Sequence, residues 1–278
     1  MPAYGFSSKN KPTSDDYLND IYDLGIRHID TASSYGSAEK KIGEYHRKNK
    51  NRFNIWTKVD GLSCNSHYTI DKIFKSLKSS IEKTNVEFFE CLYLHQNNIE
   101  IIEDKFVQKG LEAVKNHGFA NNTGVSIYND YELKSALSID VFNVVQLPVS
   151  VVNTHLYKIA QKSVYKKVLV ARSIFLQGVL LNVESFNKKF NYYDEIHSVV
   201  NFLKELAHDH NLDYLTMLVA YVNSLKDLDY IIVSSKNIQN INNIIQKSTY
   251  KLCESIISTI NEISYKENNW TNPRNWIV

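Results

Sequence analysis

Short apolar runs alternate with amphipathic segments of helical period along most of this chain. The first helical pattern begins near Ser14, where two acids follow hydroxyl residues, and it ends at Gly25. The next apolar run ends in Asp30 and is followed by a second helical pattern at residues 37–48. Regular alternation of this kind predicts an α/β fold, in which parallel strands are joined by helices.

Seven apolar runs have the length and the β-branched composition of strands. Three of them end at Asp30, Lys58 and His95, and the other four are residues 123–126, 141–146, 168–172 and 230–233. The helical patterns lie at residues 14–24, 37–48, 71–83, 105–116, 194–208 and 214–225, with further ones starting near residue 237 and covering 250–263.

The alternation runs through the chain without a linker, a low-complexity tract or an internal repeat. A (β/α)8 TIM barrel fits this length, so we expect one domain over residues 1–278. Every helix of such a barrel follows a strand, yet residues 1–13 contain no strand pattern. We therefore expect a barrel that lacks its first strand, either because the protein is naturally shortened or because the sequence starts late. Such a gap exposes two strand edges.

Composition and charge restrict the possible partners. The 278 residues are 43% hydrophobic and 22% charged, with a formal net charge of +2, which suits a soluble domain with a sizeable core. The near-neutral charge argues against a nucleic-acid partner. No apolar run approaches the ~18 residues of a membrane-spanning helix, and the N-terminus lacks a signal-peptide pattern. We expect a cytoplasmic protein with neither nucleic-acid nor membrane partners; the sequence predicts no oligomeric state.

The cysteines and histidines favour neither a disulfide framework nor a metal site. Cys64, Cys91 and Cys253 are odd in number and widely spaced, which is typical of a reducing compartment. A His-Asp-His triplet at residues 208–210 has no third ligand nearby in the sequence, so we predict no metal there.

Four ionisable side chains follow or end neighbouring strands: Asp30, Tyr35, Lys58 and His95. The carboxyl ends of parallel barrel strands share one rim, so we expect these groups to lie together. A free tyrosine has a pKa of ~10, and a nearby ammonium makes it a better acid by stabilising the phenolate. The set therefore predicts a carbonyl-reducing site, with Tyr35 as proton donor, Lys58 beside it, Asp30 holding Lys58, and neutral His95 orienting the substrate. Taken singly, each residue also has a structural explanation, such as a turn cap or a packed ring.

Seven motifs, in order over almost the whole chain, resemble those of the aldo-keto reductase superfamily. They are Ile29-Asp30-Thr31-Ala32 with Ser34-Tyr35-Gly36, Trp56-Thr57-Lys58, Leu94-His95, Gly124-Val125-Ser126, Val144-Val145-Gln146-Leu147-Pro148, the run from Arg172 to Gly178, and the run from Ile231 to Lys236. The resemblance implies NADPH-dependent reduction of a small aldehyde or ketone on a (β/α)8 barrel.

The same resemblance implies which residues bind NADP. Ser126 and Gln146 match positions that hold the nicotinamide carboxamide, while Arg172 replaces the tyrosine that many members stack on the nicotinamide ring. Two further groups match the loop around the pyrophosphate and the contacts to the 2′-phosphate and adenine. They are Ser173, Leu176, Gln177 and Gly178 for the loop, and Ser234, Lys236 and Asn240 for the adenosine half. Ile127 and Arg172 depart from the family pattern.

Three hypotheses for the function remain open. The motifs look like those of a bacterial branch found with surface-polysaccharide and nucleotide-sugar genes, which makes a keto-sugar a plausible substrate. An impaired reductase relative that serves as a nucleotide-binding or interaction subunit would also carry them. A third hypothesis, an isomerase or aldolase with Lys58 as a Schiff-base amine, is disfavoured because Asp30 and Tyr35 suit proton delivery better.

Overall fold

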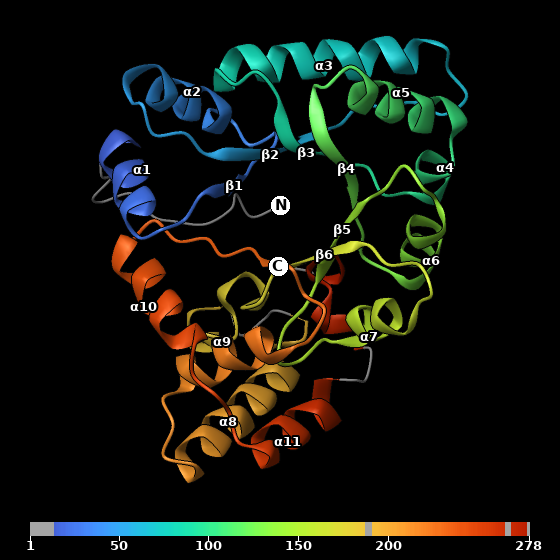
Figure 1. Ribbon diagram of the computed structural model, residues 1–278. Helices are drawn as coiled ribbons and strands as arrows, with labels where there is room; N and C mark the ends of the chain where they lie inside the picture. The colour runs from blue at the N-terminus through green and yellow to red at the C-terminus, as the bar shows by residue number, and fades with distance from the viewer. Residues whose placement is uncertain (1–13, 187–190, 265–267, 277–278) are drawn as a thin grey trace. The chain divides into compact units, whose positions relative to one another are not determined.

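The computed structural model describes residues 14–186, 191–264 and 268–276 (Figure 1). Its contacts divide the chain into two compact units, described separately below. The first unit comprises residues 1–126, 139–144 and 234–242, and the second comprises 127–138, 145–233 and 243–278. The predicted absence of a strand ahead of Ser14 concerns residues 1–13, which lie outside the described part of the chain.

Four parallel strands form the centre of the first unit, and each pairs with the next in chain order. In the register of these pairs, Asp30 lies beside Trp56 and Lys58 lies beside Tyr93. The strands are β1 (His28–Asp30), β2 (Asn54–Val59), β3 (Phe89–Leu94) and β4 (Ala120–Ser126), and the helices are α1 (Ser14–Asp23), α2 (Ala38–Lys48), α3 (Tyr68–Thr84), α4 (Ile99–Ile102) and α5 (Lys105–Asn116).

The helices of the first unit bury the apolar stripes that their periodicity predicts. Ile42 and Tyr45 of α2 are buried, as are Ile73 and Leu77 of α3. The two helices approach closely at Gly43, where an added Cβ would lie 1.8 Å from the carbonyl oxygen of Lys83. Glycine is therefore required at this helix contact.

The second unit holds the remaining strands and a layer of longer helices. In it, β6 pairs in parallel with β7, with Ala171 beside Ile231. Its elements are β5 (Val144–Pro148, which starts at the boundary), β6 (Val168–Arg172), β7 (Tyr230–Ile231), α6 (Asp130–Ser138), α7 (His155–Lys162), α8 (Tyr193–Asp209), α9 (Tyr214–Ser224), α11 (Glu254–Ser264) and the 3-10 turns η1 (Leu176–Gly178), η2 (Val183–Ser185), η3 (Asn269–Thr271) and η4 (Pro273–Asn275), while α10 (Ile238–Ser248) crosses the boundary.

Several elements differ from the sequence predictions, among them α4, which was not predicted, and β7, which is shorter than the predicted strand at 230–233. The strand predicted at 141–146 begins only at Val144, because a turn from Ile139 to Phe142 precedes it. Helix α6 was not predicted, although Asn129 caps it: its Oδ1 accepts from the backbone N–H of Glu132 at 3.0 Å. Helix α7 was not predicted either, and it buries Leu156 on its inner face. Among the described helices, none is both long and apolar enough to cross a membrane.

Candidate active site

The structure brings the four predicted catalytic residues together in the first unit. Asp30 ends β1, Lys58 lies near the end of β2, and His95 follows β3 directly. Tyr35 lies in the turn between β1 and α2, where its N–H donates to the carbonyl of Ala32 at 3.0 Å. The adjoining Gly36 has a φ of +59°, a left-handed conformation that favours glycine and lets the chain turn back into α2.

Lys58 is a buried ammonium with two oxygen partners. Its side chain is 2% exposed, and Nζ donates to the carboxylate of Asp30 and, at 2.8 Å, to the backbone carbonyl of Thr31. Burying a charge is costly unless it is paired and hydrogen-bonded, and the Asp30 carboxylate and the Thr31 carbonyl supply the pairing and the hydrogen bond.

The ring of Tyr35 lies beside this ammonium. Lys58 Nζ is 5.0 Å from the centre of the Tyr35 ring and 5.8 Å from the centre of the Tyr93 ring. Tyr35 is 42% exposed, whereas Lys58 is buried. The arrangement thus places a partly exposed tyrosine ring next to a fixed positive charge. A tyrosine that donates a proton to a bound substrate requires both access to that substrate and a nearby positive charge.

His95 also lies against the ring of Tyr35. The two ring centres are 6.1 Å apart with the rings nearly perpendicular, and His95 Nδ1 lies 3.2 Å from Asp60 Oδ2 and 3.5 Å from Ser34 Oγ. Burial lowers the pKa of His95, and the Lys58 charge lowers it further, while Asp60 opposes the shift. The imidazole is therefore neutral near pH 7, and the carboxylate of Asp60 favours the tautomer with hydrogen on Nδ1.

Asp60 was missed by the sequence analysis. It lies two residues after Lys58, and β2 is the direct neighbour of β3, which ends beside His95. The parallel pairing of these two strands was the available signal, because it places the residues after both strands at one edge.

An aromatic layer lies one step below the cluster along the strands. The Trp56 and Tyr93 rings are 5.9 Å apart, and Trp56 Nε1 donates to His28 Nδ1 at 3.0 Å. Tyr93 covers Gly124 of β4, where an added Cβ would lie 2.9 Å from the tyrosine ring and 2.5 Å from the Val144 carbonyl oxygen. These two rings pack beside Lys58 on the strands that carry the candidate catalytic groups.

The predicted cofactor residues belong to both units. Ser126, Ser234, Lys236 and Asn240 lie in the first, and Gln146, Arg172, Ser173, Leu176, Gln177 and Gly178 lie in the second. Ser126 is buried at the end of β4 and Gln146 is buried in the middle of β5, whereas Lys236 and Asn240 are exposed, with Asn240 Nδ2 donating to Ser235 Oγ at 3.2 Å.

The turn after β6 has several residues in the left-handed region. Four of its residues have positive φ: Ser173 (60°), Leu176 (46°), Gln177 (56°) and Gly178 (91°). Such conformations are strained for residues other than glycine and concentrate at functional sites. Within the turn, the N–H groups of Leu176 and Gly178 donate to the carbonyls of Ser173 and Phe175 at 2.8 Å and 2.9 Å, so both point into the turn itself. Binding of the pyrophosphate by this turn remains a prediction.

Arg172 is engaged by neighbours within the second unit. Its guanidinium carbon lies 3.9 Å from the centre of the Tyr128 ring, and Nη2 donates to the carbonyl of Ile127 at 2.9 Å. Tyr128 was not predicted as a site residue, since its role depends on a residue far away in the sequence. Stacking of Arg172 on a nicotinamide ring remains a prediction.

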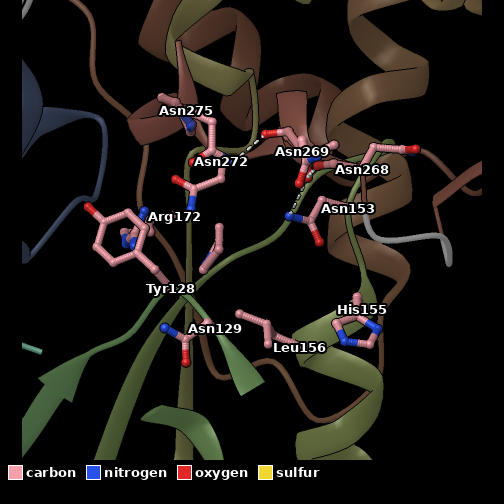
Figure 2. Close-up of a pocket in the computed structure, with 13 residues that line it drawn as sticks. Tyr128, Asn129, Asn153, His155, Leu156, Arg172, Asn268, Asn269, Asn272 and Asn275 are labelled. Carbon is pink, nitrogen blue, oxygen red and sulfur yellow. Dashed lines mark hydrogen bonds between the residues drawn. The ribbon is translucent and has the colours of Figure 1, made fainter. Parts of the chain in front are cut away.

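The described residues include no group of three or more His, Cys, Asp or Glu placed to hold a metal ion. The described part of the second unit does contain a small polar pocket beside Arg172, shown in Figure 2. Six residues between positions 268 and 275 line this pocket together with Pro148 at the end of β5.

Comparison with solved structures identifies the fold. An aldo-keto reductase from Bacillus halodurans, in its apo form, has a TM-score of 0.73 at 18% identity, covering 92% of this chain and 88% of that one. An aldo-keto reductase from Klebsiella pneumoniae in complex with NADPH has a TM-score of 0.69 at 15% identity, covering 91% and 85% of the two chains.

Comparison of sequences identifies the family. A D-galacturonate reductase from Fragaria ananassa is 25% identical over 166 residues, and this match covers 50% of the present chain and 50% of the relative. The match to the relative thus spans only half of its length. The sequence pattern of the aldo/keto reductase family matches residues 3–265, which is nearly the whole sequence. The chain therefore belongs to the aldo/keto reductase family.

Proposed function

We propose that this protein reduces an aldehyde or ketone to an alcohol with NADPH, as one domain, and that Tyr35 donates the proton. One observation carries the proposal: the buried Lys58 ammonium, held by Asp30 and the Thr31 carbonyl, lies 5.0 Å from the centre of the exposed Tyr35 ring. Membership of the aldo/keto reductase family supports this chemistry.

The proposed roles follow from charge and position. NADPH, when bound, supplies the hydride to the carbonyl carbon. The Tyr35 hydroxyl gives its proton to the carbonyl oxygen, and the nearby Lys58 charge stabilises the phenolate that remains. Asp30 and the Thr31 carbonyl fix the ammonium beside the ring. The proton then returns to Tyr35 from solvent, to which this side chain is open.

His95 orients the substrate in this proposal. With hydrogen on Nδ1 facing Asp60, its Nε2 is an acceptor. An acceptor near the reacting carbonyl suits a substrate with a hydroxyl on a neighbouring carbon. Sugars and keto-sugars have such a hydroxyl, so the geometry supports a sugar-like carbonyl substrate. The relative from Fragaria, a D-galacturonate reductase, points in the same direction.

The residues available for the cofactor suit NADPH. The left-handed turn at Ser173–Gly178 would take the pyrophosphate, and the amide of Gln146 with Ser126 would hold the carboxamide. Exposed Lys236, close to Ser234 in the chain, would pair with the 2′-phosphate that distinguishes NADPH from NADH. The Klebsiella structure was determined with NADPH.

The test is NADPH consumption with a panel of simple aldehydes, keto-sugars and D-galacturonate. We expect turnover with at least one sugar-like carbonyl, and Tyr35→Phe lowers it about 10²-fold or more while NADPH still binds. Tyr68→Phe is the matched control, because Tyr68 is 74% exposed on α3. Tight NADPH binding without turnover on any substrate would overturn the proposal in favour of a nucleotide-binding subunit.

A further inference from the structure

The carboxylate of Asp60 faces His95 across two paired strand ends. Val59 of β2 lies beside Leu94 of β3 in the parallel register, and the His95 N–H donates to the Val59 carbonyl at 2.9 Å. The next position along both strands places Asp60 and His95 next to each other, with Asp60 Oδ2 lying 3.2 Å from His95 Nδ1. The contact between the two side chains thus follows from the backbone pairing of the strands.

Two further contacts fix the chain around Asp60. Gln96 binds the backbone of Leu62 with both ends of its amide: Oε1 accepts from the Leu62 N–H, and Nε2 donates to the Leu62 carbonyl at 3.1 Å. Asp60 Oδ1 accepts from the N–H of Gly61 at 2.8 Å, and Gly61 has a φ of +71°, a conformation that favours glycine. One carboxylate oxygen is therefore held by the backbone, while the other is directed to His95.

The carboxylate decides which nitrogen of His95 carries the hydrogen. A carboxylate only accepts hydrogen bonds, and a neutral imidazole has one donor and one acceptor, so the nitrogen that faces Asp60 is the donor. Ser34 Oγ lies 3.5 Å from the same nitrogen, but a hydroxyl can donate or accept and so does not choose between the tautomers. Lys58 and Asp30, whose charges also act on His95, are paired with each other.

We propose that Asp60 is a positioning residue that sets the substrate preference of the site. By keeping the hydrogen of His95 on Nδ1, it makes Nε2 an acceptor for a hydroxyl on the carbon next to the substrate carbonyl. A ketone with an apolar group in that place leaves this nitrogen without a donor, which costs binding. The inference rests on the proposed reduction and deepens it, because it assigns the preference to a residue outside the four predicted catalytic groups.

The substitution Asp60→Asn should reverse the tautomer of His95. The Gly61 N–H still needs an acceptor, so the amide oxygen stays at Gly61 and the amide nitrogen faces His95 Nδ1. An amide nitrogen only donates, so Nδ1 becomes the acceptor and the hydrogen moves to Nε2. Asp71→Asn, at an exposed position on α3 of the same unit, removes the same charge elsewhere and is the matched control.

Nuclear magnetic resonance measures the tautomer without turnover. In protein labelled with ¹⁵N-histidine, correlations between the ring protons and the ring nitrogens distinguish a protonated nitrogen from an acceptor, and the spectrum of His95→Gln assigns the signals. Above the ordinary histidine pKa of about 6.5, we expect hydrogen on Nδ1 in the wild type and in Asp71→Asn, and on Nε2 in Asp60→Asn. Hydrogen on Nε2 in the wild type, or one tautomer in all three proteins, would overturn the inference.

Steady-state kinetics measure the preference with two nearly isosteric ketones. Hydroxyacetone carries a hydroxyl on the carbon next to its carbonyl, and butanone carries a methyl group in the same place. We expect the wild type and Asp71→Asn to have the higher kcat/KM for hydroxyacetone. Asp60→Asn should lower the ratio of the two kcat/KM values about tenfold or more, because the acceptor has become a donor.

The kinetic outcomes separate this inference from the proposed reduction. Turnover with an unchanged ratio in Asp60→Asn would overturn the role of Asp60 alone. Absence of NADPH turnover with every carbonyl compound tested would overturn the proposed reduction and the substrate preference with it, whereas the tautomer spectra would still report whether Asp60 holds His95.

Discussion

In the proposed mechanism, Lys58 contributes to both stability and chemistry. It is 2% exposed and bonds to Asp30, whose side chain is 15% exposed. Removing one partner of a buried pair leaves a buried charge and costs about 3–5 kcal/mol, whereas removing both costs much less. We predict that Lys58→Met loses reductase activity and stability together. The double variant Lys58→Met with Asp30→Asn regains most of the stability but none of the activity, as measured by urea denaturation and NADPH oxidation. Regained activity would exclude Lys58 from the chemistry.

His46 gives a pH dependence of stability. Its Nδ1 lies 2.9 Å from the Thr84 carbonyl, its Nε2 accepts from the Phe53 N–H at 3.2 Å, and the side chain is buried. Burial lowers the pKa of His46 in the folded protein. The unfolded chain therefore binds a proton on this imidazole more readily than the folded protein does. The contribution of neutral His46 to the free energy of unfolding is fully present above the unfolded pKa of about 6.5, and it is lost as the pH falls through the pKa of the folded protein.

The expected measurement is the free energy of unfolding between about pH 7.5 and about pH 5, a range that brackets the ordinary histidine pKa. Wild-type stability falls with decreasing pH, and His46→Gln, although less stable at neutral pH, loses less over the same range. His95 contributes a slope of the same sign, because burial lowers its pKa as well. Equal slopes in both proteins would show that His46 does not carry this effect.

At the scale of elements, two helical glycines differ in what an added Cβ would meet: backbone at one position and the end of a side chain at the other. A Cβ at Gly43 would lie 1.8 Å from the Lys83 carbonyl oxygen, whereas one at Gly110 would lie 2.6 Å from Ile73 Cδ1, at the end of a flexible side chain. Both substitutions gain roughly 1 kcal/mol of helix propensity. We predict that Gly43→Ala destabilises by about 1–3 kcal/mol or more, as overpacking does, and that Gly110→Ala costs less. The denaturant midpoints of the two variants test this prediction. A larger loss of stability in Gly110→Ala than in Gly43→Ala would contradict the described α2–α3 contact.

The elements that the sequence predicted well are those with a strong local pattern. The predicted bounds of Lys105–Asn116 and Val168–Arg172 are those of the structure, because an apolar run or stripe marks each along its length. Helix α6 has only nine residues and few apolar positions, and the reciprocal bonds between Asn129 and Glu132 mark its start. That capping box was visible in the sequence and was missed.

The candidate site, like the elements, was predicted where the sequence has a local pattern and missed where a residue depends on distant partners. The strand ends placed Asp30, Lys58 and His95 correctly near one another, because parallel pairing fixes which ends are neighbours. Asp60 and Tyr128 escaped the sequence analysis since their roles come from partners on other elements, His95 and Arg172. Local periodicity carries no information about such contacts.

At the scale of the whole molecule, we propose that Lys236 sets the preference for NADPH over NADH. A charged hydrogen bond is worth about 1.5–3 kcal/mol, so Lys236→Met weakens NADPH binding by roughly tenfold or more and leaves NADH binding unchanged. Fluorescence titration with both nucleotides checks this. Equal losses for NADPH and NADH would place Lys236 away from the 2′-phosphate.

The central claim is that the Tyr35 phenol, beside the buried Lys58 ammonium, delivers the proton for carbonyl reduction. A single-turnover reaction tests it most directly: wild type and Tyr35→Phe are loaded with NADPH, mixed with the best carbonyl substrate, and followed by loss of NADPH absorbance. The predicted result is a rate about 10²-fold or more lower in Tyr35→Phe, with NADPH affinity unchanged. A Tyr35→Phe protein that oxidises NADPH at the wild-type rate would contradict the account.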